Sequence, residues 1–415
     1  MIKKRYHLVF SFLRPFFRLY NRLAKGARPV PDAGHPPDQP ALIMANHVTD
    51  LDPFFLATGF KRPIFFVASD HIFRLGVISS IIRFLVAPIP IVKSRIDLRT
   101  IRTINKVIAD GGLVGLFPEG NRCFDGQTGR IPSATGKLVR QLKVPLLLYK
   151  IHGGYLTSPR WSRHGRRGAI DYELSRVLTA DELAAMTPLQ INQIIQEGIA
   201  VDAFADQHEK AVPFKGKRLA EHLERVLFIC PKCLGLSTMY SDDDLFSCVC
   251  GMQVRINVYG FFEPIDAWSR ERQTDGAFPD HVGKWNHWQQ QMLITMLDQP
   301  ERLDLTGQTP IFQDQEEVLY NCERAARSIR LDQGKIAMYT DRLEFTGKRH
   351  GVRIFSLARL DRLIVHGPQV LQFSLTDGGV FELRSRRPRS AYKYVVLNTL
   401  LQQKQKGETY GFFGL

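Results

Sequence analysis

The chain has 415 residues, which predicts two or three domains rather than one. Its hydrophobic content of 44% is ordinary for a globular protein and provides for a sizeable core. The formal net charge of +15 predicts an anionic partner, which is nucleic acid, acidic lipid or both. The longest apolar stretch, residues 75–92, is interrupted by Arg83, Pro88 and Pro90, which excludes a spanning helix of ~20 clean apolar residues.

Residues 1–28 carry cations and no acidic side chain. The cations are Lys3, Lys4, Arg5, Arg14, Arg18, Arg22, Lys25 and Arg28. On a helical wheel Arg14, Arg18, Arg22 and Lys25 share one face. The opposite face is apolar and consists of Val9, Phe12, Leu13, Phe16, Leu19, Tyr20 and Leu23. This pattern predicts an amphipathic helix lying on anionic membrane lipid; the alternative is an amphipathic helix packed on the domain. Without a small-residue cleavage site we expect no signal peptide, and a peripheral protein on the cytoplasmic face of the cell membrane.

A histidine and an aspartate follow the first buried strand. Residues 41–45 are continuously apolar, as parallel strands are, so His47 is expected at the carboxyl end of a strand, where open α/β sheets bind ligands. Asp52 precedes Pro53 and is expected near a helix cap. A turn between them can place the carboxylate on one imidazole nitrogen and leave the other free as a general base. The alternative is that both residues only cap a strand and a helix.

A second loop of this kind follows a helix over 97–109 and a buried strand over 113–117. Gly120 allows close approach of the backbone to a ligand, and Arg122 offers a planar fork suited to phosphate. Glu119 is expected to bind ligand hydroxyls or to hold Arg122. A third strand over 88–92 ends in two cations, Lys93 and Arg95. The alternative is an ordinary surface Glu–Arg pair in a loop between a strand and a helix.

These blocks resemble the four motif blocks of the glycerolipid acyltransferases, with the 1-acylglycerol-3-phosphate acyltransferases as the nearest type. The matching positions are Asn46-His47 with Asp52, Lys93 to Arg95, Phe117 to Arg122, and Val144-Pro145 before an apolar run. The resemblance spans roughly residues 40–200 and implies that His47 is the general base, assisted by Asp52. It also implies that Glu119, Gly120, Arg122 and one basic residue of the second block bind the glycerophosphate acceptor. The second block departs from the usual single arginine, so both Lys93 and Arg95 are candidates.

The rest of this domain predicts a helix over 135–143 and a buried strand over 145–151. Two capping boxes, at Thr179 and Thr187, each open a helix, and the second helix is expected to reach Asp202 or beyond. Between them and the strand lies a basic loop, residues 158–167. This loop is expected either to bind donor phosphates or lipid headgroups, or to be an ordinary solvated loop.

Four of the six cysteines form two close pairs, Cys230 with Cys233 and Cys248 with Cys250. Four thiolates in this arrangement suit tetrahedral zinc, so a closed and therefore structural site is predicted, in a small β-ribbon. The alternatives are reduced bystander thiols or disulfides. Cys123 and Cys322 are left as unpaired thiols, as in a reducing compartment.

The C-terminal part predicts a helix over 284–297, short alternating strands from about residue 316 onward, and a closing helix over 390–403. This layout resembles a pleckstrin-homology-like domain. A basic cluster lies beside the closing helix and consists of Arg384, Arg386, Arg387 and Arg389. The predicted parts are a basic membrane-surface helix (1–28), an acyltransferase domain (29–226), a zinc-ribbon-like module (227–262), a helical linker (263–315), a pleckstrin-homology-like domain (316–405) and a tail (406–415).

The predicted fold is therefore an α/β acyltransferase domain with a mostly parallel buried sheet, a small zinc ribbon, and an antiparallel β domain with a closing helix. The predicted activity is transfer of a fatty acyl group from acyl-CoA or acyl carrier protein to a lysophospholipid, with 1-acylglycerol-3-phosphate giving phosphatidic acid as the leading case. No catalytic cofactor and no nucleic-acid partner are expected. The competing hypotheses are a basic zinc-ribbon protein that binds nucleic acid and a lipid-binding scaffold on the acyltransferase fold.

Overall fold

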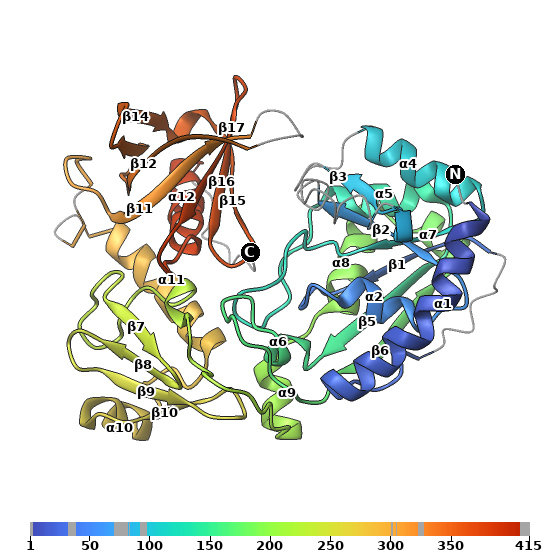
Figure 1. Ribbon diagram of the computed structural model, residues 1–415, viewed down its shortest axis with the longest axis horizontal. Coiled ribbons are helices and arrows are strands. Elements are labelled where there is room, and N and C mark those ends of the chain that lie inside the picture. The colour runs from blue at the N-terminus through green and yellow to red at the C-terminus, as the bar shows by residue number, and fades with distance from the viewer. Residues whose placement is uncertain are drawn as a thin grey trace. The chain divides into compact units, whose positions relative to one another are not determined.

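The computed structural model describes residues 3–31, 39–69, 82, 84–91, 98–299, 302–303, 305–322 and 328–406 (Figure 1). It divides into two compact units. The first unit contains the described residues up to 160 together with 165–215. The second contains 161–164 and the described residues from 216 onward, so the predicted zinc ribbon, linker and C-terminal domain all lie within it.

The first unit is built on a six-stranded sheet with the order β3-β2-β4-β1-β5-β6. Its strands are β1 (Ala41–Ala45), β2 (Ile64–Ser69), β3 (Ile89–Ile91), β4 (Leu113–Leu116), β5 (Leu146–His152) and β6 (Asp171–Leu178). All neighbouring strands are parallel except β6, which runs antiparallel to β5. The predicted mostly parallel sheet is confirmed. Because β1, β4 and β5 are central and covered, β1 and β4 are apolar throughout, and β5 is apolar from Leu146 to Tyr149.

Helices cover this sheet and close its core. They are α2 (Asp52–Ala57), α4 (Leu98–Ala109), α5 (Ala134–Leu142), α6 (Gly154–Thr157), α7 (Ala180–Ala185), α8 (Pro188–Ile199) and α9 (Ala203–Lys210). One core joins Ile104 of α4, Leu138 of α5 and Ile195 of α8 to alternate residues of the central strands. Both capping boxes form, at Thr179 and Thr187. The predicted extension of the second helix to Asp202 is wrong: α8 ends at Ile199 because the chain turns extended, and Asp202 caps the separate helix α9.

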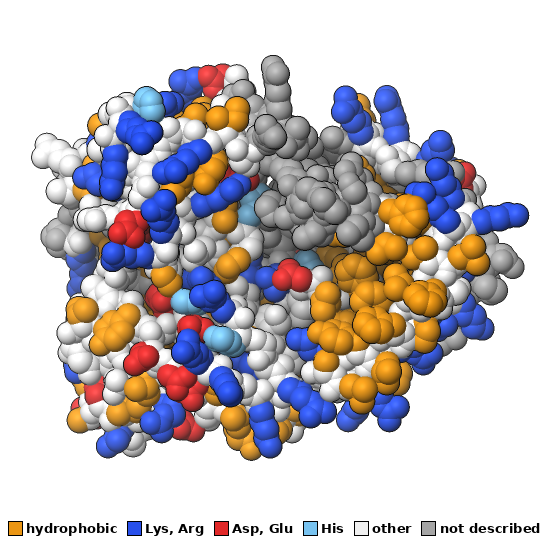
Figure 2. Space-filling view, in the orientation of Figure 1, with side chains coloured by type: hydrophobic (Ala, Val, Ile, Leu, Met, Phe, Trp, Pro, Cys, Tyr) orange, Lys and Arg blue, Asp and Glu red, His pale blue; other side chains and the backbone are white. Residues whose placement is uncertain are grey.

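The N-terminal helix α1 (Lys4–Tyr20) continues into one π-helical turn, η1 (Asn21–Lys25). It contacts the unit through the face that carries Tyr6, Arg14 and Phe17. Tyr6 packs edge-on against Phe65, Arg14 Nε donates 3.0 Å to the Thr58 carbonyl oxygen, and the Phe17 ring stacks 5.0 Å from that of Phe54. The predicted apolar face is largely turned outward: Phe12, Phe16, Leu19, Tyr20 and Leu23 are exposed, with Phe12 at 80% and Phe16 at 62% (Figure 2). Leu8 of the same helix is exposed as well. Among the described helices none is both long and apolar enough to cross a membrane.

The second unit begins with a four-stranded antiparallel ribbon in the order β10-β9-β8-β7. Its elements are the 3-10 turn η3 (Leu223–Arg225), β7 (Met239–Asp242), β8 (Leu245–Cys248), β9 (Gln253–Ile256) and β10 (Phe262–Pro264), then α10 (Ala267–Thr274) and α11 (Val282–Leu297). Trp285 of α11 is fully buried beside Phe246, Phe262 and Phe278. Its indole nitrogen donates 3.0 Å to the carbonyl oxygen of Ile229, so α11 supports the backbone immediately before Cys230.

A seven-stranded antiparallel sheet follows, in the order β14-β13-β12-β11-β17-β16-β15. Its elements are β11 (Phe312–Asn321), β12 (Ile329–Met338), β13 (Arg342–Gly347), β14 (Gly351–Ser356), η4 (Leu357–Arg359), β15 (Leu360–His366), β16 (Val370–Leu375), β17 (Val380–Ser385) and the closing helix α12 (Tyr392–Lys406). The predicted antiparallel domain with a closing helix is confirmed.

The predicted basic cluster beside α12 is mostly neutralised by carboxylates. Arg389 forms a buried two-bond pair with Glu317, at 2.6 and 2.7 Å. Arg384 Nη2 lies 2.6 Å from Glu382, and Arg387 Nε lies 2.8 Å from Glu316. Strand β11 therefore uses two adjacent glutamates to bind the segment that leads into α12. Arg386 and Arg387 are exposed at this place.

Candidate active site

His47 and Asp52 meet in the loop that leaves the carboxyl end of β1. His47 Nδ1 lies 2.9 Å from Asp52 Oδ2. The histidine side chain is partly exposed, whereas Asp52 is only 2% exposed. Within the described part of the chain Nε2 has no hydrogen-bond partner, so with Nδ1 protonated toward Asp52 it is the nitrogen that can accept a proton.

The carboxylate of Asp52 is held by its own loop. Oδ2 also accepts hydrogen bonds from the backbone N–H groups of Val48 and Thr49, at 2.7 and 2.8 Å. The Thr49 hydroxyl donates to Oδ1. Asp52 is the first residue of α2, directly before Pro53 and next to the N-cap Leu51, which agrees with its expected place near the cap. Its carboxylate binds backward onto the loop. The loop over residues 46–51 is thereby closed around one buried carboxylate.

Aromatic rings and an amide fix the other side of His47. The imidazole stacks on Phe117, with ring centroids 4.4 Å apart and planes 20° apart. Phe117 in turn stacks on Phe66 of β2, at 5.6 Å. The fully buried Asn46 side chain exchanges two hydrogen bonds with the backbone of Ile151, at 3.0 and 2.7 Å, and so locks the end of β1 to β5. These contacts come from neighbouring parallel strands of the sheet.

Glu119 lies against the backbone of this loop. One carboxyl oxygen accepts from the N–H of His47 at 2.7 Å, and the other accepts from the N–H of Gly129 at 2.7 Å. Burial raises the pKa of Glu119 to about 8, although these two backbone hydrogen bonds lower it. The carboxyl group therefore joins the two loops at the strand ends. The expectation that Glu119 holds Arg122 is replaced by this contact with backbone amides.

Arg122 points toward the loop of His47. Its Nε lies 3.2 Å from Oδ1 of Asp50, an exposed residue. Gly120 adopts a left-handed conformation, with φ of 73°, which a side chain rarely tolerates. The adjacent Cys123 is buried, and burial raises the pKa of its thiol well above the ordinary value. It is therefore not poised as a nucleophile.

Arg160, in the basic loop, binds the backbone of Arg122. The sequence did not distinguish it from the other arginines of that loop. Its guanidinium is buried, donates 2.7 Å to the carbonyl oxygen of Arg122, and lies 4.0 Å over the ring of Phe124. Arg166 of the same loop is also buried, whereas Arg163 and Arg167 are exposed. No spacing signal separates the buried arginines from the exposed ones, because the loop has no periodicity.

A second histidine–carboxylate group lies at the end of β5, but it has no free nitrogen. His152 Nδ1 is 2.6 Å from Asp206 and its Nε2 is 3.2 Å from Glu173. Hydrogen bonding to Asp206 raises the pKa of His152. A histidine held on both sides by carboxylates is suited to a structural ion pair, and His47 is the better candidate base. Lys93 and Arg95 lie outside the described residues.

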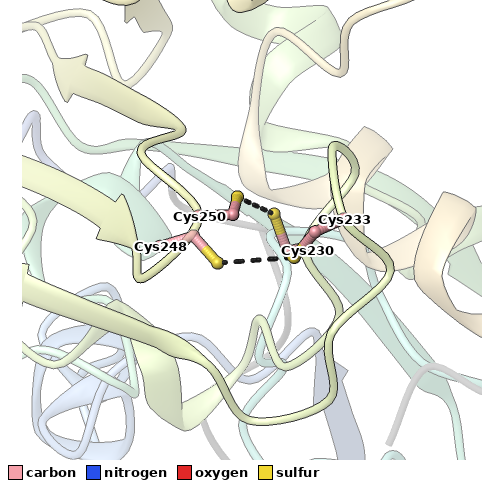
Figure 3. A group of neighbouring side chains, drawn as sticks. All are labelled: Cys230, Cys233, Cys248 and Cys250. Atoms are coloured by element: carbon pink, nitrogen blue, oxygen red, sulfur yellow. Dashed lines mark hydrogen bonds between the residues drawn. The ribbon is translucent and has the colours of Figure 1, made fainter.

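The four cysteines of the predicted metal site converge in the second unit (Figure 3). Cys230 and Cys233 lie in the turn after Ile229, and Cys248 and Cys250 lie where β8 ends. All four Sγ atoms are within 4.8 Å of one another, and the Cys230–Cys250 and Cys233–Cys248 pairs are 3.7 Å apart. Tetrahedral zinc with bonds of ≈ 2.3 Å needs sulfur–sulfur distances of about 3.8 Å, so the residues fit such an ion.

Comparison with known proteins bears on the first unit. A model of the family described as Acyltransferase matches residues 25–148, which contain His47, Asp52, Glu119 and Arg122. The chain carries an acyltransferase domain. A probable 1-acyl-sn-glycerol-3-phosphate acyltransferase of Mycoplasma genitalium is 27% identical over 179 residues, which cover 40% of this chain. Over these residues the chain is thus similar to a protein named as a 1-acylglycerol-3-phosphate acyltransferase.

The chain spans 63% of the length of that Mycoplasma relative. Among solved structures, the 1-acyl-sn-glycerophosphate acyltransferase of Thermotoga maritima aligns with 17% identity and a TM-score of 0.42. That alignment covers 51% of this chain and 85% of the other.

Proposed function

We propose that the protein transfers a fatty acyl group from a thioester, acyl-CoA or acyl carrier protein, to the free hydroxyl of 1-acylglycerol-3-phosphate, which gives phosphatidic acid. The observation that carries this proposal is the His47–Asp52 pair, with Nδ1 bound and Nε2 free at a strand end. The family match around this pair supports acyl transfer as the reaction class. The name of the Mycoplasma relative supports the lysophosphatidic acceptor.

In the proposed reaction, Nε2 of His47 takes the proton of the acceptor hydroxyl as its oxygen attacks the thioester carbonyl carbon. The carbon–sulfur bond then breaks, and the imidazolium returns the proton to the leaving thiolate. The buried Asp52 carboxylate stabilises the imidazolium and fixes its orientation. No serine or cysteine nucleophile is needed, since the attacking oxygen belongs to the substrate. The step uses no catalytic cofactor.

For the acceptor phosphate we propose Arg122, with the backbone at Gly120 and a contribution from Lys93 or Arg95. Supporting this, Arg122 is held in place through its backbone by Arg160, and its guanidinium pairs with the exposed Asp50. A phosphate that displaces Asp50 would gain the bidentate fork of the guanidinium. Glu119 accepts a hydrogen bond from the backbone N–H of His47. We propose that this contact fixes the position of the His47 loop relative to Arg122.

We further propose that the protein works at the cytoplasmic face of the cell membrane, with α1 on anionic lipid. The exposed apolar row from Leu8 to Leu23 supports this, because large exposed apolar patches mark interaction surfaces (Figure 2). We also propose one structural zinc ion on Cys230, Cys233, Cys248 and Cys250. Four protein ligands leave no open position for catalysis.

The test is an acyl-transfer assay with labelled acyl-CoA and acyl carrier protein against a panel of lysophospholipids, together with the variant Arg122→Ala. We expect transfer to 1-acylglycerol-3-phosphate, and a loss in Arg122→Ala of roughly 10- to 100-fold in kcat/KM for this acceptor, since a hydrogen bond to a charged group contributes ≈ 1.5–3 kcal/mol. Thioester affinity should be unchanged. Lys137→Ala, which removes an exposed cation of α5, is the control.

Two results would contradict the proposal. An equal loss for a monoacylglycerol, which lacks the phosphate, would remove Arg122 from phosphate binding. Absence of transfer to every acceptor would contradict the activity itself: with intact lipid binding it would favour a scaffold on the acyltransferase fold, and with tight, salt-sensitive binding of an oligonucleotide it would favour the nucleic-acid hypothesis.

A further inference from the structure

The β13–β14 hairpin of the second unit presents exposed cations at its tip. Strand β13 ends at Gly347, β14 begins at Gly351, and the turn consists of Lys348, Arg349 and His350. All three turn residues are exposed. Within the described part of the chain, neither Lys348 nor Arg349 has a side-chain hydrogen bond or ion pair. Figure 2 shows Lys and Arg side chains gathered over the part of this unit where Figure 1 labels β12 and β14.

The turn has a fixed backbone shape. Asp332 of β12 is 5% exposed, and its Oδ2 accepts from the N–H groups of Arg349 and His350, at 3.1 and 2.9 Å. The same oxygen lies 3.2 Å from His350 Nδ1. A side chain on Gly347 would collide with this carboxylate, since its Cβ would lie 2.1 Å from Oδ2. The hairpin tip is thus held by a buried carboxylate while its two long cationic side chains extend into solvent.

Two aliphatic side chains continue the same surface along the edge strand. Val352 and Ile354 are 55% and 63% exposed. They lie two residues apart on β14 and therefore on one face of the sheet, and β14 is an edge of the seven-stranded sheet. Through the register of β12, β13 and β14, the exposed Lys335 lies on this face in line with Val352. We name Lys335, Lys348, Arg349, Val352 and Ile354 the hairpin face.

The hairpin face differs from the other basic group of this domain. In the cluster beside α12, Arg384, Arg387 and Arg389 are each matched to a glutamate. On the hairpin side, the acidic residue opposite Ile354 is Glu344, which lies 3.6 Å from Arg342. Among the described residues, no carboxylate forms an ion pair with the side chain of Lys348 or Arg349.

We propose that the hairpin face is a membrane-docking surface, which inserts Val352 and Ile354 shallowly between lipids while Lys335, Lys348 and Arg349 bind anionic headgroups. It would act in addition to α1 and does not depend on the acyltransferase activity. Charge complementarity favours an anionic bilayer, because it offers dispersed negative charge and, directly beneath it, apolar chains for the exposed aliphatic pair. A nucleic acid would satisfy the cations but would leave Val352 and Ile354 against phosphate and water, since an edge-strand aliphatic pair offers no ring on which bases stack.

The test measures partition of the full chain onto vesicles of phosphatidylcholine alone and of an equal mixture of phosphatidylcholine and phosphatidylglycerol. The variants are Lys348→Gln with Arg349→Gln, and Val352→Thr with Ile354→Thr, which keeps the β-branched side chains of the strand. We expect the charge variant, which removes two cations, to bind the anionic vesicles roughly 30-fold more weakly, since each cation near such a surface contributes ≈ 1 kcal/mol. The aliphatic variant should weaken binding at high salt as well, because its contribution is not electrostatic.

Matched controls separate this surface from general charge. Arg255→Gln with Arg270→Gln removes two exposed arginines from the ribbon part of the same unit. Val177→Thr changes an exposed β-branched residue on the edge strand β6 of the first unit. The proposal expects both controls to bind vesicles as the unaltered chain does. Unfolding temperatures of all variants show whether each one is folded.

Contact is read directly from Ile354→Trp with lipids brominated in their acyl chains. Quenching beyond that of the unaltered chain is expected if this position enters the bilayer. The proposal is overturned if the charge and aliphatic variants bind anionic vesicles as well as the controls do. It is also overturned if the charge variant keeps vesicle binding but loses binding of an oligonucleotide or of an acidic peptide, or if the indole introduced by Ile354→Trp is not quenched.

Discussion

Asp52 accepts hydrogen bonds from His47 Nδ1 and from two backbone amides on a single buried oxygen. The carboxylate therefore folds the loop and orients the imidazole at once. An asparagine in its place presents at most one acceptor oxygen and adds an N–H₂ donor, so it cannot satisfy all of these donors. Loop shape and imidazole tautomer depend on the same atom.

We expect His47→Ala to lower kcat by roughly 10²–10⁴-fold with little change in unfolding temperature, because it removes a partly exposed base from a loop that Asp52 still holds. Asp52→Asn should lower kcat and unfolding temperature together. Steady-state kinetics and thermal melts of both variants check this. If His47→Ala turns over at near-normal rate, the general-base assignment is wrong.

Glu119 makes a prediction about stability and pH. Its carboxyl group ionises at a pKa of about 8 in the folded chain and near 4.5 when exposed. Between these values the folded chain holds a proton that the unfolded chain has released. The stability that this proton gives the folded chain is therefore complete at low pH and is lost as the pH rises toward 8. Glu119→Gln stays neutral throughout. We expect the stability of the unaltered chain, relative to this variant, to decrease between about pH 5 and about pH 8.

Urea unfolding of the two proteins across this pH window measures the effect. Glu209→Gln, which changes an exposed glutamate of α9, is the control and should show no such trend. A difference between the unaltered chain and Glu119→Gln that stays constant with pH would show that Glu119 is already ionised in the folded state.

The sequence contained enough to predict that His47 and Asp52 are neighbours, because their spacing closes a turn after an apolar strand. It did not show what Glu119 contacts. Its partners are backbone N–H groups, at His47 and at Gly129, and a backbone amide has no residue type that a sequence could reveal. Arg160 was hidden for a related reason, since its acceptor is the carbonyl oxygen of Arg122.

At the scale of elements, α1 shows an unusual division of its surface. It packs on the domain through Tyr6, Arg14 and Phe17 and turns the phenylalanines at 12 and 16 outward. The helical wheel had grouped Arg14 with the outer cations, but its Nε is bound to the Thr58 carbonyl oxygen. The wheel separates polar from apolar side chains and cannot show which of the two faces meets the protein.

We expect Phe12→Ser with Phe16→Ser to weaken binding to anionic liposomes and to lower activity on bilayer substrate, while activity on a soluble short-chain lysophospholipid is kept. The reason is loss of apolar area that enters the interface. Liposome sedimentation and parallel assays measure both effects. Leu189→Ser, at an exposed leucine of α8, is the control. Unchanged liposome binding would show that the row on α1 is not the membrane contact.

The central strands were predictable because burial on both faces makes them continuously apolar, and β1 begins and ends where the apolar run does. The edge strand β6 has a mixed pattern and was not predicted, since half-exposed strands with Glu173 and Arg176 resemble loops in composition. In the second unit the alternating strands and the closing helix α12 were predictable. The long β11 was not, because its early residues are polar.

At the scale of the whole molecule, we expect about one zinc ion per chain, lost in Cys230→Ser or Cys248→Ser. Trp285 binds the Ile229 carbonyl oxygen beside the cluster, so zinc loss should also shift tryptophan fluorescence and lower the unfolding temperature of the second unit. Elemental analysis, fluorescence and calorimetry measure these changes. Cys322→Ser, a buried cysteine outside the cluster, should keep its zinc. Protein purified without chelators that contains no zinc would refute the site.

The path of the chain between the units has a consequence for how the protein can be divided. Residues 161–164 belong to the second unit, although residues on both sides of them belong to the first. Trp161 is buried, and its carbonyl oxygen accepts 2.9 Å from Arg225 Nη1. During synthesis, residues 1–215 are complete before Arg225 has been added to the chain. The hydrogen bond from Arg225 to Trp161 therefore forms only after the first unit has been synthesised. A fragment that ends at residue 215 would leave this tryptophan without it, and a single cut after residue 215 would separate residues 161–164 from the rest of the second unit.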